Sequence, residues 1–305
     1  MDLIVSFLAS DIRTTTPLLI AALGMVFSAR AGIVNIGMEG FMLMGALMGV
    51  VGSFWTGSAF GGALIAMFCT MLLSLVFAYF TIRVQADQTV VGAAINIFSM
   101  GFTTTLNRVI FGRDTTPPII NTFDPVPIPG LSKLPVVGQA FFTHPLPTYL
   151  AFLAVPLAWY VMKHTHIGLK IRAVGENPKT CDTLGINVHR VRLWSVLVSG
   201  LFAGLAGAFV SMGQLSVFVE NMISGRGFMV LAVVVFGRYT PIGVMIAALI
   251  FGAGDALMYR LQASNAGLPF QISTILPYFI TLLAVCGLVK KSKPPASSGV
   301  PYKKE

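Results

Sequence analysis

Long apolar segments separated by short polar stretches fill most of the chain. A straight membrane span needs about 20 apolar residues, and several of the segments are shorter and carry Gly or Pro, which is typical of helices interrupted around a pathway. The first and the seventh segments are the clearest short cases. The pattern predicts nine helices that cross or enter a membrane: Thr14–Ala29, Asn35–Phe54, Ala59–Ile82, Thr89–Phe111, Pro147–Met162, Leu193–Gly213, Met222–Phe236, Ile242–Tyr259 and Phe270–Val289.

Composition supports this reading. Hydrophobic residues make up 55% of the chain, charged residues only 10%, and the mean hydropathy is +0.83. A soluble domain has about 25% charged residues, so this chain cannot cover its own surface with polar groups. We therefore expect an all-α polytopic membrane protein with about nine transmembrane segments, some discontinuous, in a single domain over residues 1–305. Met1–Ser10 lacks the basic start of a signal peptide and is expected to lie in the membrane interface.

The basic residues predict the orientation. If the C-terminus is cytoplasmic, 14 of the 20 Lys and Arg residues fall on the cytoplasmic side, so the N-terminus is predicted to lie outside. The net charge of +9 is then explained by topology, and nucleic acid is not needed. Two connections are long: a Pro-rich extracytoplasmic loop at about 112–146, expected to be extended, and a cytoplasmic loop at about 163–192.

The cytoplasmic loop contains one polar stretch with the signals of a short helix. It reads AVGENPKTCDTLGINV over residues 173–188. Asn177 can accept the first free N–H groups as N-cap, and Pro178 then stands at the first helical position. Gly185 stands where a helix ends in the left-handed region, and Ile186 follows where an apolar contact is common. These caps predict an exposed helix of about seven residues.

Several chemistries have no motif in this sequence. There is no G-x-x-x-x-G-K-[ST] loop for ATP, no H-E-x-x-H and no G-x-S-x-G, and the three cysteines are far apart. We expect neither a metal nor a cofactor in this chain and no enzymatic activity of its own. A polytopic transporter of undefined energy source is what the pattern and composition indicate.

Polar side chains inside apolar segments are candidates for a translocation pathway, because they are costly in hydrocarbon. For Glu39, fixing a broken helix end or lining the pathway is one alternative, and pairing with Arg30 at the interface is the other. For Arg226, a place on the pathway is one alternative, and a snorkelling side chain or a structural pair with Glu220 is the other. Asp255 is expected at the interface. The Asn residues also suit interhelical hydrogen bonds. The candidate set is Asn35, Glu39, Asn96, Asn107 and Arg226.

Three stretches resemble one known family. GENPKTCDTLGINV (175–188) is similar to the cytoplasmic signature of permease subunits of bacterial ABC importers, in the branched-chain amino acid/ribose permease family. RAGIVNIGMEGFMLMGALMG (30–49) and VVVFGRYTPIGVMIAALIFGAGDAL (233–257) resemble the branch that imports nucleosides or simple sugars. The departures are Cys181 and Leu184, where smaller residues are usual, and Arg238-Tyr239-Thr240, where a Trp-Asn type of pair is expected.

The resemblance implies a division of labour in the bacterial cytoplasmic membrane. A second permease subunit, separate ABC ATPase subunits that hydrolyse ATP, and an extracytoplasmic solute-binding lipoprotein would complete the importer. The polar helix would be a coupling helix that docks on the ATPase. The alternative from another class is a self-contained secondary transporter driven by an ion gradient. The residues implied in coupling are Gly175, Glu176, Asn177, Pro178, Lys179, Thr180, Asp182, Leu184 and Gly185.

Overall fold

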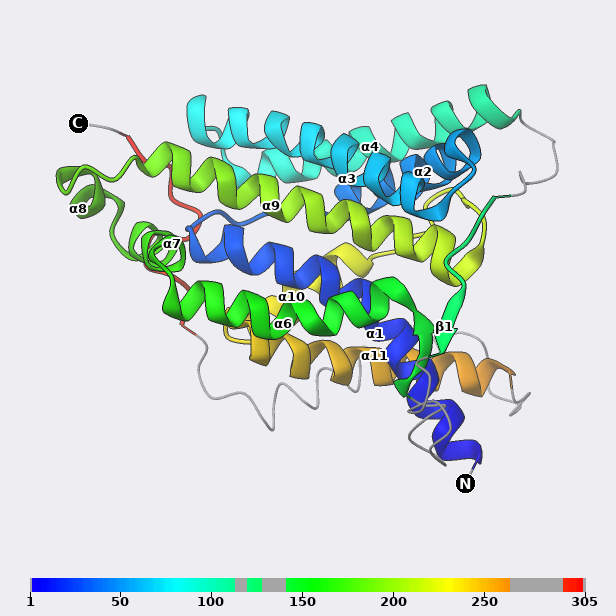
Figure 1. The fold of residues 1–305 in the computed structure, drawn as a ribbon. Helices are drawn as coiled ribbons and strands as arrows, with labels where there is room; N and C mark the ends of the chain where they lie inside the picture. The colour runs from blue at the N-terminus through cyan, green and yellow to red at the C-terminus, as the bar shows by residue number, and fades with distance from the viewer. Residues whose placement is uncertain (1, 113–119, 128–140, 264–292, 304–305) are drawn as a thin grey trace.

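The computed structural model describes residues 2–112, 120–127, 141–263 and 293–303, and most of these residues are helical. Long helices lie side by side, and the two ends of the chain lie at opposite ends of the bundle (Figure 1). The elements are α1 (Asp2–Arg30), α2 (Met38–Thr56), α3 (Ala59–Ala78), η1 (Tyr79–Arg83), α4 (Gln88–Phe111), β1 (Pro125–Pro127), β2 (Thr143–Pro145), α6 (Leu146–His164), α7 (His166–Glu176), α8 (Pro178–Thr183), α9 (Val188–Phe209), η3 (Val210–Leu215), α10 (Arg226–Phe236) and α11 (Pro241–Ala263).

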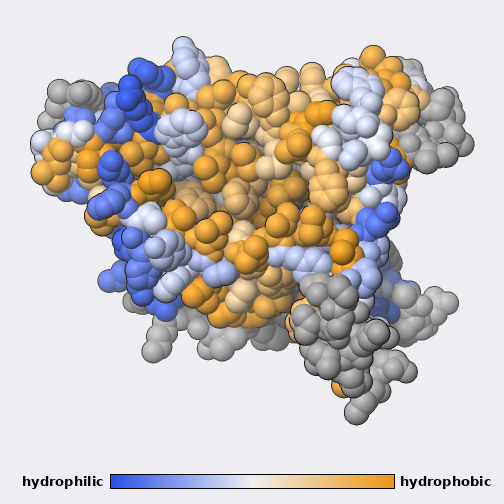
Figure 2. Space-filling view, in the orientation of Figure 1, coloured by the Kyte–Doolittle hydropathy of each residue, from blue (hydrophilic) through white to orange (hydrophobic). Residues whose placement is uncertain are grey.

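The predicted all-α membrane fold is confirmed. Seven helices among the described residues are long and apolar enough to cross a membrane, and α10, with 11 residues, is a shorter apolar helix. Figure 2 shows the result on one face of the molecule, where apolar residues form a broad band between hydrophilic ends. Eight of the nine predicted segments are thus helices, and the ninth, Phe270–Val289, lies outside the described residues.

The first segment differs from its prediction. It is not short, and no separate interfacial segment precedes it, because α1 continues without a break from Asp2 through Pro17 to Arg30. Polar residues lower the hydropathy of its first half, but they point into the bundle. The Thr14 hydroxyl donates to the carbonyl of Gly252 in α11 at 2.9 Å, and the Thr15 hydroxyl donates to Asp11 at 3.0 Å. Hydrogen bonds satisfy these groups, so the helix can continue through them.

The centre of the bundle consists of α1, α2 and α9. In the most apolar windows of α1 and α2, 89% and 83% of residues are buried, against 22% in α4 at the periphery. Glycines allow the central helices to approach: a Cβ on Gly45 of α2 would lie 2.6 Å from the carbonyl oxygen of Gly204 in α9. Small residues serve this purpose in membrane proteins, where packing rather than water exclusion holds helices together.

Two interruptions divide the bundle into comparable halves. Residues 31–37 are not helical and lead from α1 into α2, and residues 216–225 lead from η3 into α10 in the same way. In each half a long helix is followed by a non-helical stretch, a helix that starts inside the bundle and a returning helix. The orders α1–α2–α3 and α9–α10–α11 run in opposite directions (Figure 1). The short seventh segment is therefore confirmed as a discontinuous helix.

The long Pro-rich loop, predicted at about 112–146, is described in part. Residues 120–124 have no regular structure, and β1 pairs with β2 in antiparallel register, with Val126 opposite His144. These parts match the predicted extended loop, while residues 113–119 and 128–140 lie outside the described residues. The loop at about 163–192 holds two helices, α7 and α8, and only α8 is predicted from the sequence.

Candidate translocation pocket and coupling helix

Glu39 joins the two interrupted helices. It is the second residue of α2, and its carboxylate accepts hydrogen bonds from the backbone N–H groups of Gly225 at 2.8 Å and Gly227 at 2.7 Å, at the start of α10. Of the two alternatives for Glu39, the fixing of a broken helix end is the one that the structure shows. Arg30 is not its partner, because Arg30 Nε donates to the carbonyl of Tyr239 at 2.7 Å.

Helix electrostatics explain this contact. The first N–H groups of a helix have no partner within the helix, and the aligned peptide dipoles place partial positive charge there. A carboxylate is a strong acceptor for these N–H groups, because hydrogen bonds to an ionised acceptor are stronger than those to a neutral one. Gly227 permits the approach, since a Cβ at this position would overlap the backbone of Glu39.

The asparagines hold the other interruption. Asn96 of α4 donates to the carbonyl of Ile36 at 3.0 Å and accepts from the N–H of Gly40 at 2.8 Å. Asn35 is fully buried and accepts from the N–H of Gly37 at 3.0 Å. Both side chains therefore fix the start of α2, as interhelical and turn hydrogen bonds. Asn107 is half-buried in the last turns of α4 and is not among the residues that line the pocket described next.

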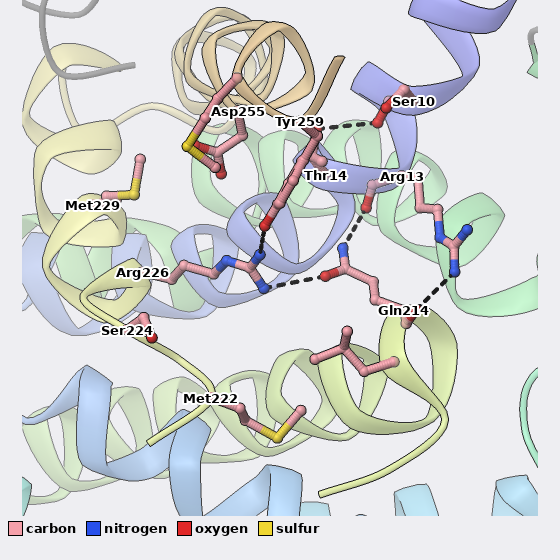
Figure 3. A pocket seen from close by; sticks show the side chains of 12 residues that line it. Ser10, Arg13, Thr14, Gln214, Met222, Ser224, Arg226, Met229, Asp255 and Tyr259 are labelled. Atoms are coloured by element: carbon pink, nitrogen blue, oxygen red, sulfur yellow. Dashed lines mark hydrogen bonds between the residues drawn. The ribbon is translucent and has the colours of Figure 1, made fainter. Parts of the chain in front are cut away.

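A pocket of about 460 Å³ lies near the end of the bundle where α1 begins and α11 ends. It brings together α1, η3, the interruption before α10, α10 itself and α11 (Figure 3). Polar groups and flexible thioethers alternate around it. Its lining consists of Ser10, Arg13, Thr14, Gln214, Leu215, Met222, Ser224, Arg226, Met229, Asp255, Met258 and Tyr259.

Arg226 is the member of the predicted pathway set that lines this pocket. Its Nη1 donates to Gln214 Oε1 at 3.1 Å and its Nη2 to the hydroxyl of Tyr259 at 2.8 Å, as Figure 3 shows. The proposed pairing with Glu220 is wrong, because Glu220 forms an exposed ion pair with Arg108 at 2.8 Å. Arg226 is the first residue of α10, so the turn that Glu39 caps also fixes the position of Arg226.

Asp255 was assigned to the interface, and the structure corrects this. Its side chain is 7% exposed and lies in the pocket, on the same face of α11 as Tyr259. The apolar pattern placed the end of the helix at Tyr259, whereas α11 continues to Ala263, so Asp255 lies deeper. The spacing of Asp255 and Tyr259, four residues apart on one helix face, is the signal that could have revealed it.

The loop before α10 adopts strained backbone conformations. Ser216, Asn221 and Ser224 have φ of 59°, 56° and 49°, in the left-handed region that non-glycine residues seldom occupy. Such conformations persist where surrounding contacts determine them, and they are frequent at binding sites. The pocket volume falls within the range of about 300–1,000 Å³ that is typical of small-molecule sites.

At the opposite end of the bundle, the predicted capped helix is confirmed as α8. Asn177 Oδ1 accepts from the N–H of Thr180 at 3.2 Å, and Pro178 is the first helical residue. Gly185 has φ of 78°, and the N–H of Ile186 donates to the carbonyl of Cys181 at 3.0 Å. With the bond from Gly185 N–H to the Asp182 carbonyl at 2.9 Å, this is a complete Schellman motif.

The residue that follows α8 exposes an apolar side chain to solvent, whereas an apolar residue within the helix is buried. Leu184 is 74% exposed, whereas Cys181 packs with Val174, Val188 and Tyr302 in a small cluster. Burial raises the pKa of the Cys181 thiol, so it is a packing residue here and not a reactive one. The remaining predicted coupling residues are on or beside α8, with Glu176, Lys179 and Thr180 exposed and Gly175 buried.

The C-terminal tail fastens α7 to the bundle. Ser297 donates to the Gly175 carbonyl through both its N–H at 2.9 Å and its hydroxyl at 2.7 Å. The fully buried side chain of Arg192 donates to the carbonyls of Ala31 and Val300, each at 3.2 Å, and to Ser297 Oγ at 3.3 Å. The tail therefore ties the ends of α1, α7 and α9 together, and its Tyr302 packs in one cluster with Cys181 of α8.

The fold and these sites define a multi-pass permease of the cell membrane. The chain belongs to the family described as "Branched-chain amino acid transport system / permease component", which matches residues 7–285. The resemblance noted in the sequence is confirmed by this match.

Three curated relatives cover most of the chain. The guanosine ABC transporter permease protein NupQ of Bacillus subtilis is 40% identical over 94% of this chain and 92% of its own length. The nucleoside ABC transporter permease protein NupC of Lactococcus lactis is 36% identical over 94% of this chain and 93% of its own length. The Haloferax volcanii protein named "Putative glucose ABC transporter permease protein TsgC13" is 36% identical over 88% of this chain and 81% of its own length.

We predict that Glu39→Ala strongly reduces transport and destabilises the packing of α10. Its loss leaves two N–H groups without acceptors, at a cost of about 1–3 kcal/mol for each buried group. Glu39→Gln retains one acceptor oxygen and should fall between wild type and Glu39→Ala. The measurements are solute uptake and the thermal midpoint of the purified protein. Glu220→Ala, which removes an exposed ion pair, is the control, and an equal loss in both alanine variants contradicts the role assigned to Glu39.

Proposed function

We propose that this chain is the transmembrane permease subunit of an ABC importer that moves nucleosides, or related simple sugars, by alternating access. The observation that carries the proposal is the capped helix α8, exposed at one end of a bundle that holds a solute-sized pocket toward the other. The identity of 40% to a guanosine permease over nearly the whole chain supports nucleosides as the solute class.

The proposed assembly contains a second, different permease. Bacillus subtilis and Lactococcus lactis each have a second relative of this chain, named guanosine permease NupP at 28% identity and nucleoside permease NupB at 25% identity. Two permeases with the same named solute in one organism fit a heterodimer. ATPase subunits and an extracytoplasmic binding lipoprotein complete the proposed importer, and the end of the bundle with α7 and α8 faces the cytoplasm.

The pocket suits a neutral, polar and partly aromatic solute. Gln214, Tyr259 and Arg226 offer donors and acceptors for hydroxyl groups and base edges, while the thioethers of Met222 and Met229 offer a polarisable apolar wall. A pocket built only from charged groups would select ions instead. This mixture of groups matches the chemistry of a nucleoside.

The motion driven by ATP would reach the permease through α8. ATP binding closes the ATPase dimer, and a short rigid helix with both ends capped moves as one body with the surface on which it docks. The exposed side chain of Leu184 is suited to fill an apolar depression in that surface, with Lys179 and Asp182 giving polar contacts. The tail contacts at Gly175 pass this motion to α1 and α9.

The first test separates ATP-driven import from ion-coupled transport. Uptake of labelled guanosine by cells that express the chain with its neighbouring transport genes should stop when the P-loop Lys of the ATPase is replaced. It should persist when a protonophore collapses the ion gradient while ATP is maintained. Uptake that survives the ATPase substitution and disappears with the gradient contradicts the proposal and favours a secondary transporter.

The second test concerns docking on the ATPase. Leu184→Asp, and separately the pair Glu176→Ala and Asp182→Ala, should lower solute-stimulated ATP hydrolysis by the reconstituted transporter several-fold without removing the protein from the membrane. Leu184→Asp places a charge in an apolar contact, which is unfavourable. Val126→Asp, an exposed apolar residue on β1 at the other end, is the matched control. Unchanged stimulation in the α8 variants would refute the docking role.

The third test concerns the pocket. Arg226→Met should reduce the maximal rate of uptake by about tenfold or more, because it removes both hydrogen bonds that organise Gln214 and Tyr259. Tyr259→Phe should have a smaller effect in the same direction. Arg108→Met, an exposed arginine outside the pocket, serves as control. Wild-type rates in both pocket variants would show that the solute passes elsewhere.

A further inference from the structure

A second groove, unrelated to the pocket above, opens on the outer face of the bundle between α6 and α9. It has a volume of about 650 Å³, and its floor includes Phe27 of α1. The walls are almost entirely apolar, from Leu157 of α6 to Val198 and Phe202 of α9. In Figure 2 the surface over these helices is largely hydrophobic, with hydrophilic residues at the end where α7 lies.

The groove has the length of one membrane leaflet. Along α9 its lining runs from Arg190, near the first residue of the helix, to Phe202, near the middle of the span Val188–Leu215. At 1.5 Å per residue this distance is about 18 Å, close to half of the hydrocarbon thickness of about 30 Å. The groove therefore covers the half of the membrane on the side of α8 and not the other half.

Two cations stand at the open end of this groove. Lys170 from α7 and Arg190 from α9 line it there, both are exposed, and no acidic side chain lines it. Within the described part of the chain, neither side chain takes part in an ion pair. Trp194, which is 66% exposed, lies one turn deeper, at the level where indole rings mark the membrane interface.

We propose that this groove binds an anionic phospholipid of the cytoplasmic leaflet, with its phosphate between Lys170 and Arg190 and one acyl chain along α6 and α9. The orientation rests on the proposed function. Basic clusters between helices on the cytoplasmic side are suited to such headgroups. A helix of a partner subunit would instead bury both cations against apolar surface, which is costly without an opposing acid.

The bound lipid would bridge the two helices on either side of α8. Lys170 belongs to α7, which precedes α8, and Arg190 belongs to α9, which follows it. A single phosphate between them therefore links both flanks of the coupling helix. Each basic residue close to an anionic headgroup contributes roughly a fivefold preference over a zwitterionic lipid.

The experiment uses Trp194 as the probe in the assembled transporter. The fluorescence of Trp194 is obtained as the fluorescence of the unchanged protein minus that of the variant Trp194→Phe. Both proteins are placed in vesicles of brominated phosphatidylcholine, which quenches the Trp194 fluorescence. Unlabelled phosphatidylglycerol is then added in increasing share. If the site prefers the anionic lipid, phosphatidylglycerol relieves a much larger fraction of the quenching than its fraction of the membrane lipid.

Variants identify the charges responsible. In the double variant that carries Lys170→Gln and Arg190→Gln, the preference for the anionic lipid should fall by roughly fivefold for each charge removed. Lys163→Gln is the matched control, because Lys163 is an exposed cation at the same end of α6 that lies over Trp159 and does not line the groove. Should the double variant fail to assemble, Lys170→Gln alone, with an exposed side chain, gives the comparison.

Three outcomes would overturn the proposal. The first is relief of quenching in proportion to membrane composition in the unchanged protein. The second is an equal fall in preference in Lys163→Gln. The third is quenching of the Trp194 fluorescence by brominated lipid in the isolated chain but not in the assembled transporter. That result would mean that a protein partner, and not a lipid, covers the groove. None of these readouts requires transport, so failure here is distinguishable from failure of the proposed function.

Discussion

The bundle depends on one contact, in which the carboxylate of Glu39 accepts hydrogen bonds from the N–H groups of Gly225 and Gly227 at the start of α10. Both interrupted helices begin inside the bundle, where a helix start without hydrogen-bond partners is unfavourable. The start of α2 is fixed by Asn35 and Asn96, and the start of α10 is fixed by Glu39, which α2 itself carries. The position of α10, and of Arg226 in the pocket, therefore follows from the position of α2.

The far end of α10 is held as firmly as its start. Arg30, the last residue of α1, donates to the carbonyls of Tyr239 at 2.7 Å and Arg238 at 3.3 Å in the turn after α10. The carbonyl of Arg30 in turn lies against Gly175, where a Cβ would overlap it. A continuous set of contacts thus runs from the pocket along α10 to Arg30 and on to α7 and α8. Contacts of this kind are what a rigid-body mechanism requires, because packed elements transmit displacement without deforming.

Local signals in the sequence predicted more than tertiary ones. The caps of α8 were predictable because Asn177, Pro178 and Gly185 act within their own turn, and most spans were predictable from apolar length. The partner of Glu39 lies 186 residues away, and no local pattern indicates it. Hydropathy also misplaced the start of α1, because it scores Thr14 and Thr15 as polar although α11 accepts their hydrogen bonds, and it misplaced Asp255, which is buried. The amphipathic α7 was missed because its length and polarity resemble a loop.

One departure from the pattern that the resemblance implies, at Arg238 and Tyr239, lies in this same set of contacts. Arg238 and Tyr239 have φ of 55° and 56°, a conformation that Asn tolerates better than either residue. The ring of Tyr239 lies 6.0 Å from the guanidinium of Arg30, whose hydrogen bonds also hold both carbonyls of the turn. Tertiary contacts here replace the local preference of the usual residues. Since such conformations persist only where surrounding contacts determine them, the joint between α10 and α11 is suited to move as part of one body with α1.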